Sequence, residues 1–301
     1  MTRKLLQASL STATRASYNR MLKAYEQFCK EHFPLSQAYP SSHMMVSHFI
    51  SFLFLQNYKP STIASYVSAI SYVHKLKCLT DPTNSFLIKK IIKGAQNLRS
   101  SCDTRLPITK EILSKLLLAV SNVIRDQFNQ FLLKAMMSLA FHCFLRIGEI
   151  AVKNKNENNK VLQLSDISVG YKNQVPINMT VTITFYKHSD LRPKTILITR
   201  NFGNMFCPVK TMMDYIKVAK HKSGPLFQFL CGTPVSYTYF NSSLKSLLIC
   251  IGLSPELYKG HSFRIGAATS EAAKGTSLSV IQQMGRWKSN ALQNYIRMDN
   301  F

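Results

Sequence analysis

The sequence predicts a mainly α-helical protein of two domains, with a small β-hairpin or sheet in the second domain. Three observations predict this class. Apolar side chains recur at helical spacing along most of the 301 residues, one central stretch alternates as a strand does, and a polar segment near residue 100 interrupts the helical pattern. With 46% hydrophobic residues, the chain is long enough to build a core in each domain.

Four amphipathic helices are predicted in the first hundred residues. In each of them the apolar side chains step by three and four residues, which gathers them on one face. The third helix is expected to begin after Pro60, with Ser61 as its N-cap. The four apolar sets are Tyr18, Leu22, Tyr25 and Cys29; Val46, Phe49, Ile50 and Leu53; Ile63, Tyr66, Val67 and Ile70; and Ile88, Ile91, Ile92 and Ala95.

The polar segment RSSCDTRLPITKE marks a domain boundary. It contains Pro107, and it is followed by Thr109 as the expected N-cap of a new helix and by Glu111 in the positive first turn of that helix. We therefore expect a helical domain over residues 1–100, a linker over 101–107 and a second domain over 108–301.

The second domain is predicted to combine buried helices with one hairpin. The apolar stretch FLLKAMMSLAFHCFL is shorter than the ~20 apolar residues of a spanning helix, so we expect a buried helix. The alternating stretch INMTVTITFYKHSDLRPKTILITR predicts strands over 179–187 and 195–199, with Lys187 at the mouth of the hairpin. Further helices are expected around 208–220, 237–251, 262–274 and 278–284, followed by a last helix that Ser289 caps and that carries Tyr295.

The charge of the chain favours a polyanionic partner. Lys and Arg number 38 against 14 Asp and Glu, a formal net charge of +24, and both halves carry the excess. The favoured partner is nucleic acid, and the second candidate is an anionic membrane surface. The seven widely spaced cysteines, with no CxxC pair, read as reduced intracellular thiols and make a zinc site unexpected.

Several residues are suited to phosphate chemistry. Arg146 and Glu149 follow directly after the apolar helix, where the arginine is either a phosphate ligand or half of an ion pair. His261 and Arg264 lie three residues apart at a helix start, where both can face one anion. Together with Lys187, Trp287 and Tyr295 they supply cations, proton donors and a hydroxyl nucleophile, a complete set for metal-free phosphoryl transfer. Because no paired-carboxylate motif is present, two-metal nuclease chemistry is disfavoured.

The order of these residues resembles the tyrosine recombinase family, which includes Cre, lambda integrase and the Xer recombinases. LRIGEI is similar to the first arginine box, HSFRIGAAT to the His-x-x-Arg box, and GRWKSNALQNYIR to the segment that leads to the nucleophilic tyrosine. The wording GHSFRIGAATSEAAKG followed by GRWKSNALQNYIR looks closest to DIRS-type and Crypton-type mobile-element enzymes. The resemblance implies a DNA-breaking-rejoining architecture, with residues 1–100 as a core-binding (SAM-like) DNA-binding domain and 108–301 as the catalytic domain.

The resemblance also implies roles for the site residues. Tyr295 would attack a DNA phosphodiester and form a 3′-phosphotyrosyl link, while Lys187 protonates the leaving 5′-oxygen and His261 acts as acid and base. The non-bridging oxygens would be bound by Arg146, Arg264 and the indole of Trp287, with Glu149 in support. No metal, ATP or other cofactor is expected.

The expected role is integration or excision of a mobile element. We expect double-stranded DNA as the partner. The protein is expected to be a monomer when free and a homotetramer on two DNA sites. It is expected to act at DNA inside the cell, in the nucleus if the source is eukaryotic. The basic residues expected to contact DNA are Arg15, Arg20, Lys23, Lys89, Lys90, Lys93, Lys288 and Arg297.

Three departures from the family pattern keep alternatives open. The interval from Trp287 to Tyr295 is eight residues where many members have nine, and six residues follow Tyr295, too few for the C-terminal helix that related enzymes dock onto a neighbour. Lys187 is placed by hairpin position alone, so Lys172 and Lys194 remain rivals. The alternative functions are a type IB topoisomerase-like nicking and relaxing enzyme and a recombinase-derived DNA-binding protein without catalysis.

Overall fold

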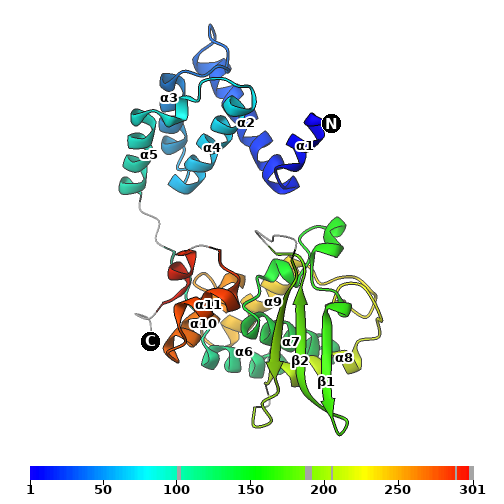
Figure 1. The fold of residues 1–301 in the computed structure, drawn as a ribbon. Coiled ribbons are helices and arrows are strands. Elements are labelled where there is room, and N and C mark those ends of the chain that lie inside the picture. The colour runs from blue at the N-terminus through cyan, green and yellow to red at the C-terminus, as the bar shows by residue number, and fades with distance from the viewer. Residues whose placement is uncertain (100–102, 187–191, 205, 289, 298–301) are drawn as a thin grey trace. The chain divides into compact units, whose positions relative to one another are not determined.

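The computed structural model describes residues 1–99, 103–186, 192–204, 206–288 and 290–297. The chain divides into two compact units, Met1–Asp103 and Thr104–Phe301 (Figure 1). Most elements are helices, and the described strands form one small antiparallel sheet. The predicted fold class, mainly α with a small sheet, is confirmed.

The first unit is built from helices around one apolar core. Val46, Ile63, Ile70 and Ile88 are almost completely buried, as their helical spacing predicts. The sequence predicted four of the helices and did not predict α1. The helices are α1 (Thr2–Ala8), α2 (Thr12–His32), α3 (His43–Leu55), α4 (Pro60–Leu76) and α5 (Phe86–Leu98), with a 3₁₀ turn over Pro82–Asn84 before α5.

Side-chain caps define three helix starts of this unit. Ser11, Ser42 and Ser85 each accept a hydrogen bond from a backbone N–H three residues further along. The predicted cap at Ser61 is wrong. Helix α4 begins at Pro60, two residues before the start that a Ser61 cap would give. Pro60 occupies the first helical position, where its fixed φ and missing N–H are tolerated, and Lys59 precedes it without a side-chain cap.

The second unit places its helices around a larger core. Helix α7 packs against α6, α8 and α10, and Thr109 caps α6 as predicted. The helices of this unit are α6 (Lys110–Val123), α7 (Gln127–His142), α8 (Pro208–Val218), α9 (Tyr237–Cys250), α10 (Gly260–Ala273) and α11 (Leu278–Gly285).

Strands β1 (Ile167–Lys172), β2 (Val175–Ile183) and β3 (Lys194–Thr199) form the sheet in the order β1-β2-β3. Met179, Val181 and Ile183 are buried on one face, as predicted. The predicted continuation to residue 187 is wrong in its described part, since β2 ends at Ile183, which pairs with Lys194, and Phe185 is exposed. The next partner would be Pro193, which has no N–H to donate. Lys187 lies outside the described residues.

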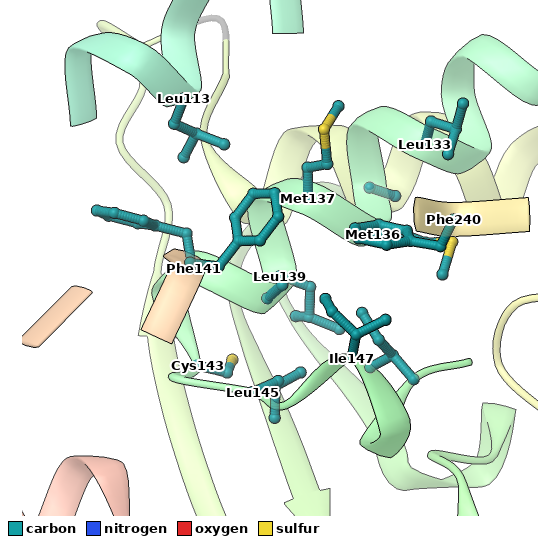
Figure 2. Close-up of a cluster of buried hydrophobic side chains, with 14 of the residues drawn as sticks. Leu113, Leu133, Met136, Met137, Leu139, Phe141, Cys143, Leu145, Ile147 and Phe240 are labelled. Carbon is teal, nitrogen blue, oxygen red and sulfur yellow. The ribbon is translucent and has the colours of Figure 1, made fainter. Parts of the chain in front are cut away.

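The C-terminal half of α7 forms the centre of the core (Figure 2). Met136, Leu139 and Phe141 on this helix and Leu145 just after it are buried, in one cluster with Phe240 from α9. Burial on this scale fixes the end of α7, and with it the position of the residues that follow. In the described part of the chain, no helix is long and apolar enough to cross a membrane.

Candidate active site

The first part of the site is the turn that follows α7. A 3₁₀ turn over Ile147–Glu149 folds the Glu149 carboxylate back onto Arg146. Oε1 of Glu149 lies 3.0 Å from Nη1 of Arg146, and Oε2 accepts the backbone N–H of Arg146. Glu149 is buried, while 19% of the Arg146 side chain remains exposed. The structure therefore contains the ion pair that the sequence offered as one of two alternatives, and part of the Arg146 side chain faces solvent.

The second part is the start of α10. The helix can approach the Arg146 turn closely because residue 260 is glycine: a Cβ atom there would lie 2.5 Å from the Ile147 side chain. Arg264, one turn into α10, is fully buried. Its Nη1 donates to the backbone oxygen of Phe144 at 2.6 Å, and its Nη2 donates to the backbone oxygen of Gly285. One arginine thus joins the end of α7, α10 and the end of α11.

The third part is the segment after α11. Trp287 packs directly over Gly285, where a Cβ atom would overlap the indole ring. The Trp287 ring lies 4.9 Å from the Tyr295 ring between centroids, and the guanidinium carbon of Arg264 lies 4.0 Å from the Trp287 ring centre. Trp287 is 8% exposed, and its Nε1 has no hydrogen-bond partner in the described part of the chain. A buried indole N–H without a protein acceptor is suited to donate to a ligand oxygen.

Tyr295 is held by its backbone as well as by its ring. It ends a 3₁₀ segment over Asn290–Tyr295, where the sequence predicted a capped helix; the expected cap, Ser289, lies outside the described residues. The Thr269 hydroxyl on α10 donates to the Tyr295 backbone oxygen at 3.2 Å and accepts the backbone N–H of Arg297. The ring of His261 lies 6.4 Å from that of Tyr295 between centroids. Residues from α10 therefore hold the tyrosine on two sides.

Arg286 is a further member of the site, and the sequence analysis did not single it out. Its Nη2 lies 2.8 Å from Oε2 of Glu149, and its side chain is 2% exposed. Sequence spacing could have identified Arg286. Many family members have an interval of nine residues before the nucleophilic tyrosine, and Arg286, not Trp287, lies nine residues before Tyr295. Trp287 was assigned instead because the family resemblance of GRWKSNALQNYIR implies an indole donor in this segment.

The site has more positive than negative charge. Arg146, Arg264 and Arg286 share a single carboxylate, that of Glu149. Burial and the proximity of the other two arginines lower the pKa of Arg264 to about 9, and burial also lowers the pKa of Arg286. Because isolated charges are costly to bury, this excess favours an anionic ligand. The described residues contain no His, Cys, Asp and Glu group that could hold a metal ion.

The structure brings together most of the predicted catalytic residues. Arg146, His261, Arg264, Trp287 and Tyr295 come from three separate segments and converge through the contacts above, with Glu149 in support. Lys187 cannot be placed, since it lies outside the described residues. Of its rivals, Lys194 begins β3 and lines a cavity together with Arg286 and Met284, while Lys172 ends β1.

The predicted DNA-contacting residues lie on several surfaces. On α2, Arg20 and Lys23 are exposed and Arg15 is partly buried; on α5, Lys89, Lys90 and Lys93 are all exposed. In the second unit, Lys288 is exposed and Arg297 is partly buried near Tyr295. Their contact with DNA remains a prediction.

Comparison with known proteins identifies the family. Residues 108–300 match the phage integrase family, so the chain belongs to this family of tyrosine recombinases. This confirms the family resemblance that the sequence motifs suggested. No curated protein matches the sequence.

Solved recombinase structures share the fold at low sequence identity. The XerH site-specific recombinase bound to its difH substrate is 16% identical, with a TM-score of 0.62 over 94% of this chain and 76% of that chain. A variant of the Tn1549 transposon integrase in complex with transposon right end DNA is 12% identical, with a TM-score of 0.65 over 98% and 92%. A lambda integrase dimer bound to a COC′ core site is 12% identical, with a TM-score of 0.62 over 99% and 75%.

Proposed function

We propose that this recombinase cuts and rejoins double-stranded DNA at specific sites, with Tyr295 as the nucleophile. The observation that carries the proposal is the packing of Tyr295 against Trp287 and Arg264, in a site with three guanidinium groups and one carboxylate. Such a site offers a hydroxyl nucleophile beside the positive charge that a phosphodiester in its transition state requires.

The proposed cleavage step exchanges one phosphate ester for another. His261 accepts the proton of the Tyr295 hydroxyl, and the phenolic oxygen attacks the DNA phosphorus. The bond from phosphorus to the 5′-oxygen breaks, and Lys187 gives its proton to that oxygen. The products are a 3′-phosphotyrosyl link and a free 5′-hydroxyl, so the reverse reaction with a second 5′-hydroxyl rejoins DNA without ATP or a metal.

Arg146, Arg264 and Trp287 are proposed to bind the non-bridging oxygens. Arg146 is the partly exposed arginine and retains donors beyond its bond to Glu149. Arg264 in this structure donates from both terminal nitrogens to backbone oxygens. We infer that it exchanges one of these bonds for a phosphate oxygen, which requires Trp287 and the segment after α11 to shift when DNA binds.

The two units have separate proposed tasks. Residues 1–100 form a core-binding DNA-binding domain and residues 108–301 the catalytic domain, joined by the linker over 101–107. The exposed basic side chains of α2 and α5 support this assignment, because cations that release counterions from phosphates supply much of DNA affinity.

The proposed biological role is integration or excision of a mobile element. The resemblance of the motif wording to DIRS-type and Crypton-type enzymes supports this role. The Tn1549 integrase, a transposon enzyme, shares the fold. Joining two duplexes requires four cleavage events, so we propose a homotetramer on two DNA sites that forms from monomers, acting in the nucleus if the host is eukaryotic.

A pool of many DNA sequences tests the reaction, so the target site need not be chosen in advance. The protein is incubated with nicked duplexes that are randomised around the scissile position, and protein–DNA adducts are isolated under denaturing conditions and sequenced. The proposal expects wild type to enrich one sequence, with DNA joined through its 3′ end. Relaxation of supercoiled plasmid without sequence enrichment would instead establish the topoisomerase-like alternative, and salt-sensitive binding without any adduct would establish the binding-only alternative.

A further inference from the structure

We propose that Arg286 is a positioning residue for strand cleavage: it holds Glu149 in place, and through Glu149 it aligns Arg146 with the phosphate. This inference rests on the proposed function, because it concerns the same site. It goes beyond that function by assigning a task to a residue outside the set named for catalysis.

The backbone directs the Arg286 side chain into the protein. Arg286 follows α11 in the left-handed region, with φ of 59°, a conformation that non-glycine residues adopt infrequently. Its side chain extends to the end of α7, where Nη1 donates to the backbone oxygen of Cys143 at 3.2 Å and Nη2 donates to that of Phe144 at 3.3 Å. The left-handed turn thus connects the segment that carries Tyr295 to the segment that carries Arg146.

Glu149 is fixed from two sides. Arg146 binds Oε1 through Nη1 at 3.0 Å, and Arg286 binds Oε2 through Nη2 at 2.8 Å. The Arg286 bond is the contact that ties this carboxylate to the C-terminal segment. Without it, the carboxylate would be held by Arg146 alone, through the backbone N–H and Nη1, and would be free to move together with the Arg146 side chain. The Arg146 guanidinium would then lose its fixed orientation.

Arg286 also shares a hydrogen-bond acceptor with Arg264. The backbone oxygen of Phe144 accepts from Arg264 and from Arg286, and the backbone oxygen of Gly285, the residue before Arg286, accepts from Arg264 as well. Both phosphate-binding arginines are therefore connected to Arg286 through shared partners. A shift of Arg286 is transmitted to both.

The geometry distinguishes positioning from direct phosphate binding. The Arg286 side chain is 2% exposed, against 19% for Arg146, and both of its terminal nitrogens donate to protein oxygens, as those of Arg264 do. Unlike Arg264, which donates to backbone oxygens, Arg286 also pairs with the buried Glu149 carboxylate, and moving it to a phosphate would leave that carboxylate with one cation fewer.

A double-mutant cycle tests the coupling through Glu149. R286Q, E149Q and the double variant are compared with wild type in the rate of adduct formation, at saturating concentrations of the DNA selected from the randomised pool. R286Q is expected to slow the reaction about 100-fold, the order of effect of a misplaced catalytic group. The half-saturating DNA concentration should stay unchanged. In the E149Q background, R286Q is expected to add less than a threefold further loss. Equal losses in both backgrounds, or an unchanged rate in R286Q, would overturn the proposal.

Two further variants separate positioning from general structural damage. R286K can still pair with Glu149 and is expected to react at least tenfold faster than R286Q; a rate no faster than that of R286Q contradicts the proposal. R200Q is the matched control, because Arg200 also donates to a backbone oxygen, that of Pro176, and should react at the wild-type rate. Melting temperatures of all variants report whether each has folded.

Orthovanadate keeps the test independent of DNA cleavage. If wild type forms no adduct with the pool, the proposed function fails, and the same cycle is then read from the affinity for orthovanadate by calorimetry. The positioning role predicts that R286Q weakens this affinity in the Glu149 background and leaves it unchanged in the E149Q background. Equal weakening in both backgrounds would show that Arg286 contacts the oxyanion directly and would overturn the proposal.

Discussion

The guanidinium carbon of Arg264 lies 4.0 Å from the centre of the Trp287 ring, in a part of the protein where both side chains are buried. A guanidinium over an indole face is a favourable cation–π arrangement, and burial strengthens it. The Tyr295 ring packs against the same indole, and its centre lies 5.6 Å from the guanidinium carbon of Arg264, so the three side chains form one cluster. Trp287 is therefore both a packing residue and a possible hydrogen-bond donor, and the two roles can be separated.

Replacing Trp287 by phenylalanine should affect the reaction more than the fold. Phenylalanine retains an aromatic face for Arg264 and Tyr295 but removes an N–H that has no partner in the described residues. We expect W287F to melt close to wild type and to form the adduct about 100-fold more slowly, as expected for loss of one transition-state donor. W287A should lower the free energy of unfolding by about 3–5 kcal/mol. An unchanged adduct rate in W287F would contradict the donor role.

Gly285 should tolerate no side chain. A Cβ atom there would lie 1.5 Å from a carbon of the Trp287 ring, so G285A must displace the indole. We expect a loss of about 1–3 kcal/mol in the free energy of unfolding, typical of overpacking, together with slower adduct formation. G203A is the control in the same unit, because its Cβ would meet only an ordinary contact at 3.6 Å. Equal stability of the two variants in urea unfolding would contradict the packing described here.

An oxyanion should stabilise the second unit, Thr104–Phe301, in a pH-dependent manner. The pKa of Arg264 is lowered to about 9 by burial, Arg146 and Arg286, below its unfolded value, so unfolding takes up a proton between these two pKa values. Stability without an anion therefore rises as pH rises through about 9, while the anion binds best below it, where Arg264 is charged. Thermal unfolding should show a gain of about 2.7 kcal/mol at an orthovanadate concentration of about 100 times Kd. The stabilisation by orthovanadate should shrink above the pKa of Arg264. A stabilisation of the same size in R146Q would contradict binding of the oxyanion at this site.

The lysines of α5 should contribute to DNA affinity through salt-dependent contacts. We expect the triple variant K89Q, K90Q and K93Q to bind duplex DNA more weakly and to flatten the dependence of log K on log salt by up to about 0.9 for each lost phosphate contact. The control removes the same charge at Lys160, Lys210 and Lys274, which already pair with carboxylates. Filter binding over a range of salt concentrations measures both slopes. Equal slopes in the two variants would remove α5 from the DNA-binding surface.

Local patterns predicted much of the fold because they report local physics. The helical spacing of Val46, Ile63 and Ile88 predicted burial, and Thr109 predicted a helix start, since both depend on residues within one or two turns. Strand β1 was missed although its sequence ISVGYK alternates apolar and polar residues, because six residues are a short signal and the strand depends on pairing with β2. The predicted end of β2 was wrong because it depends on Pro193, the residue before the partner strand β3.

The site was predictable in its residues and less so in its contacts. Arg146, His261, Arg264 and Tyr295 were identified from their types and spacing. The role of Arg286 depends on a left-handed backbone turn and on an ion pair to Glu149, 137 residues away, and no local pattern predicts either. The sequence also did not predict the complete burial of Arg264, because only the folded chain places backbone oxygens around its guanidinium.

The central claim is that Tyr295 becomes covalently joined to DNA, and mass spectrometry of the adduct tests it most directly. Wild-type adduct formed on the selected DNA is digested with nuclease and protease, and the peptide that carries a residual nucleotide is sequenced. The account predicts a nucleotide 3′-phosphate on Tyr295 and no adduct in the Tyr295→Phe variant. A nucleotide on another residue, or an adduct that Tyr295→Phe forms as readily as wild type, would contradict it.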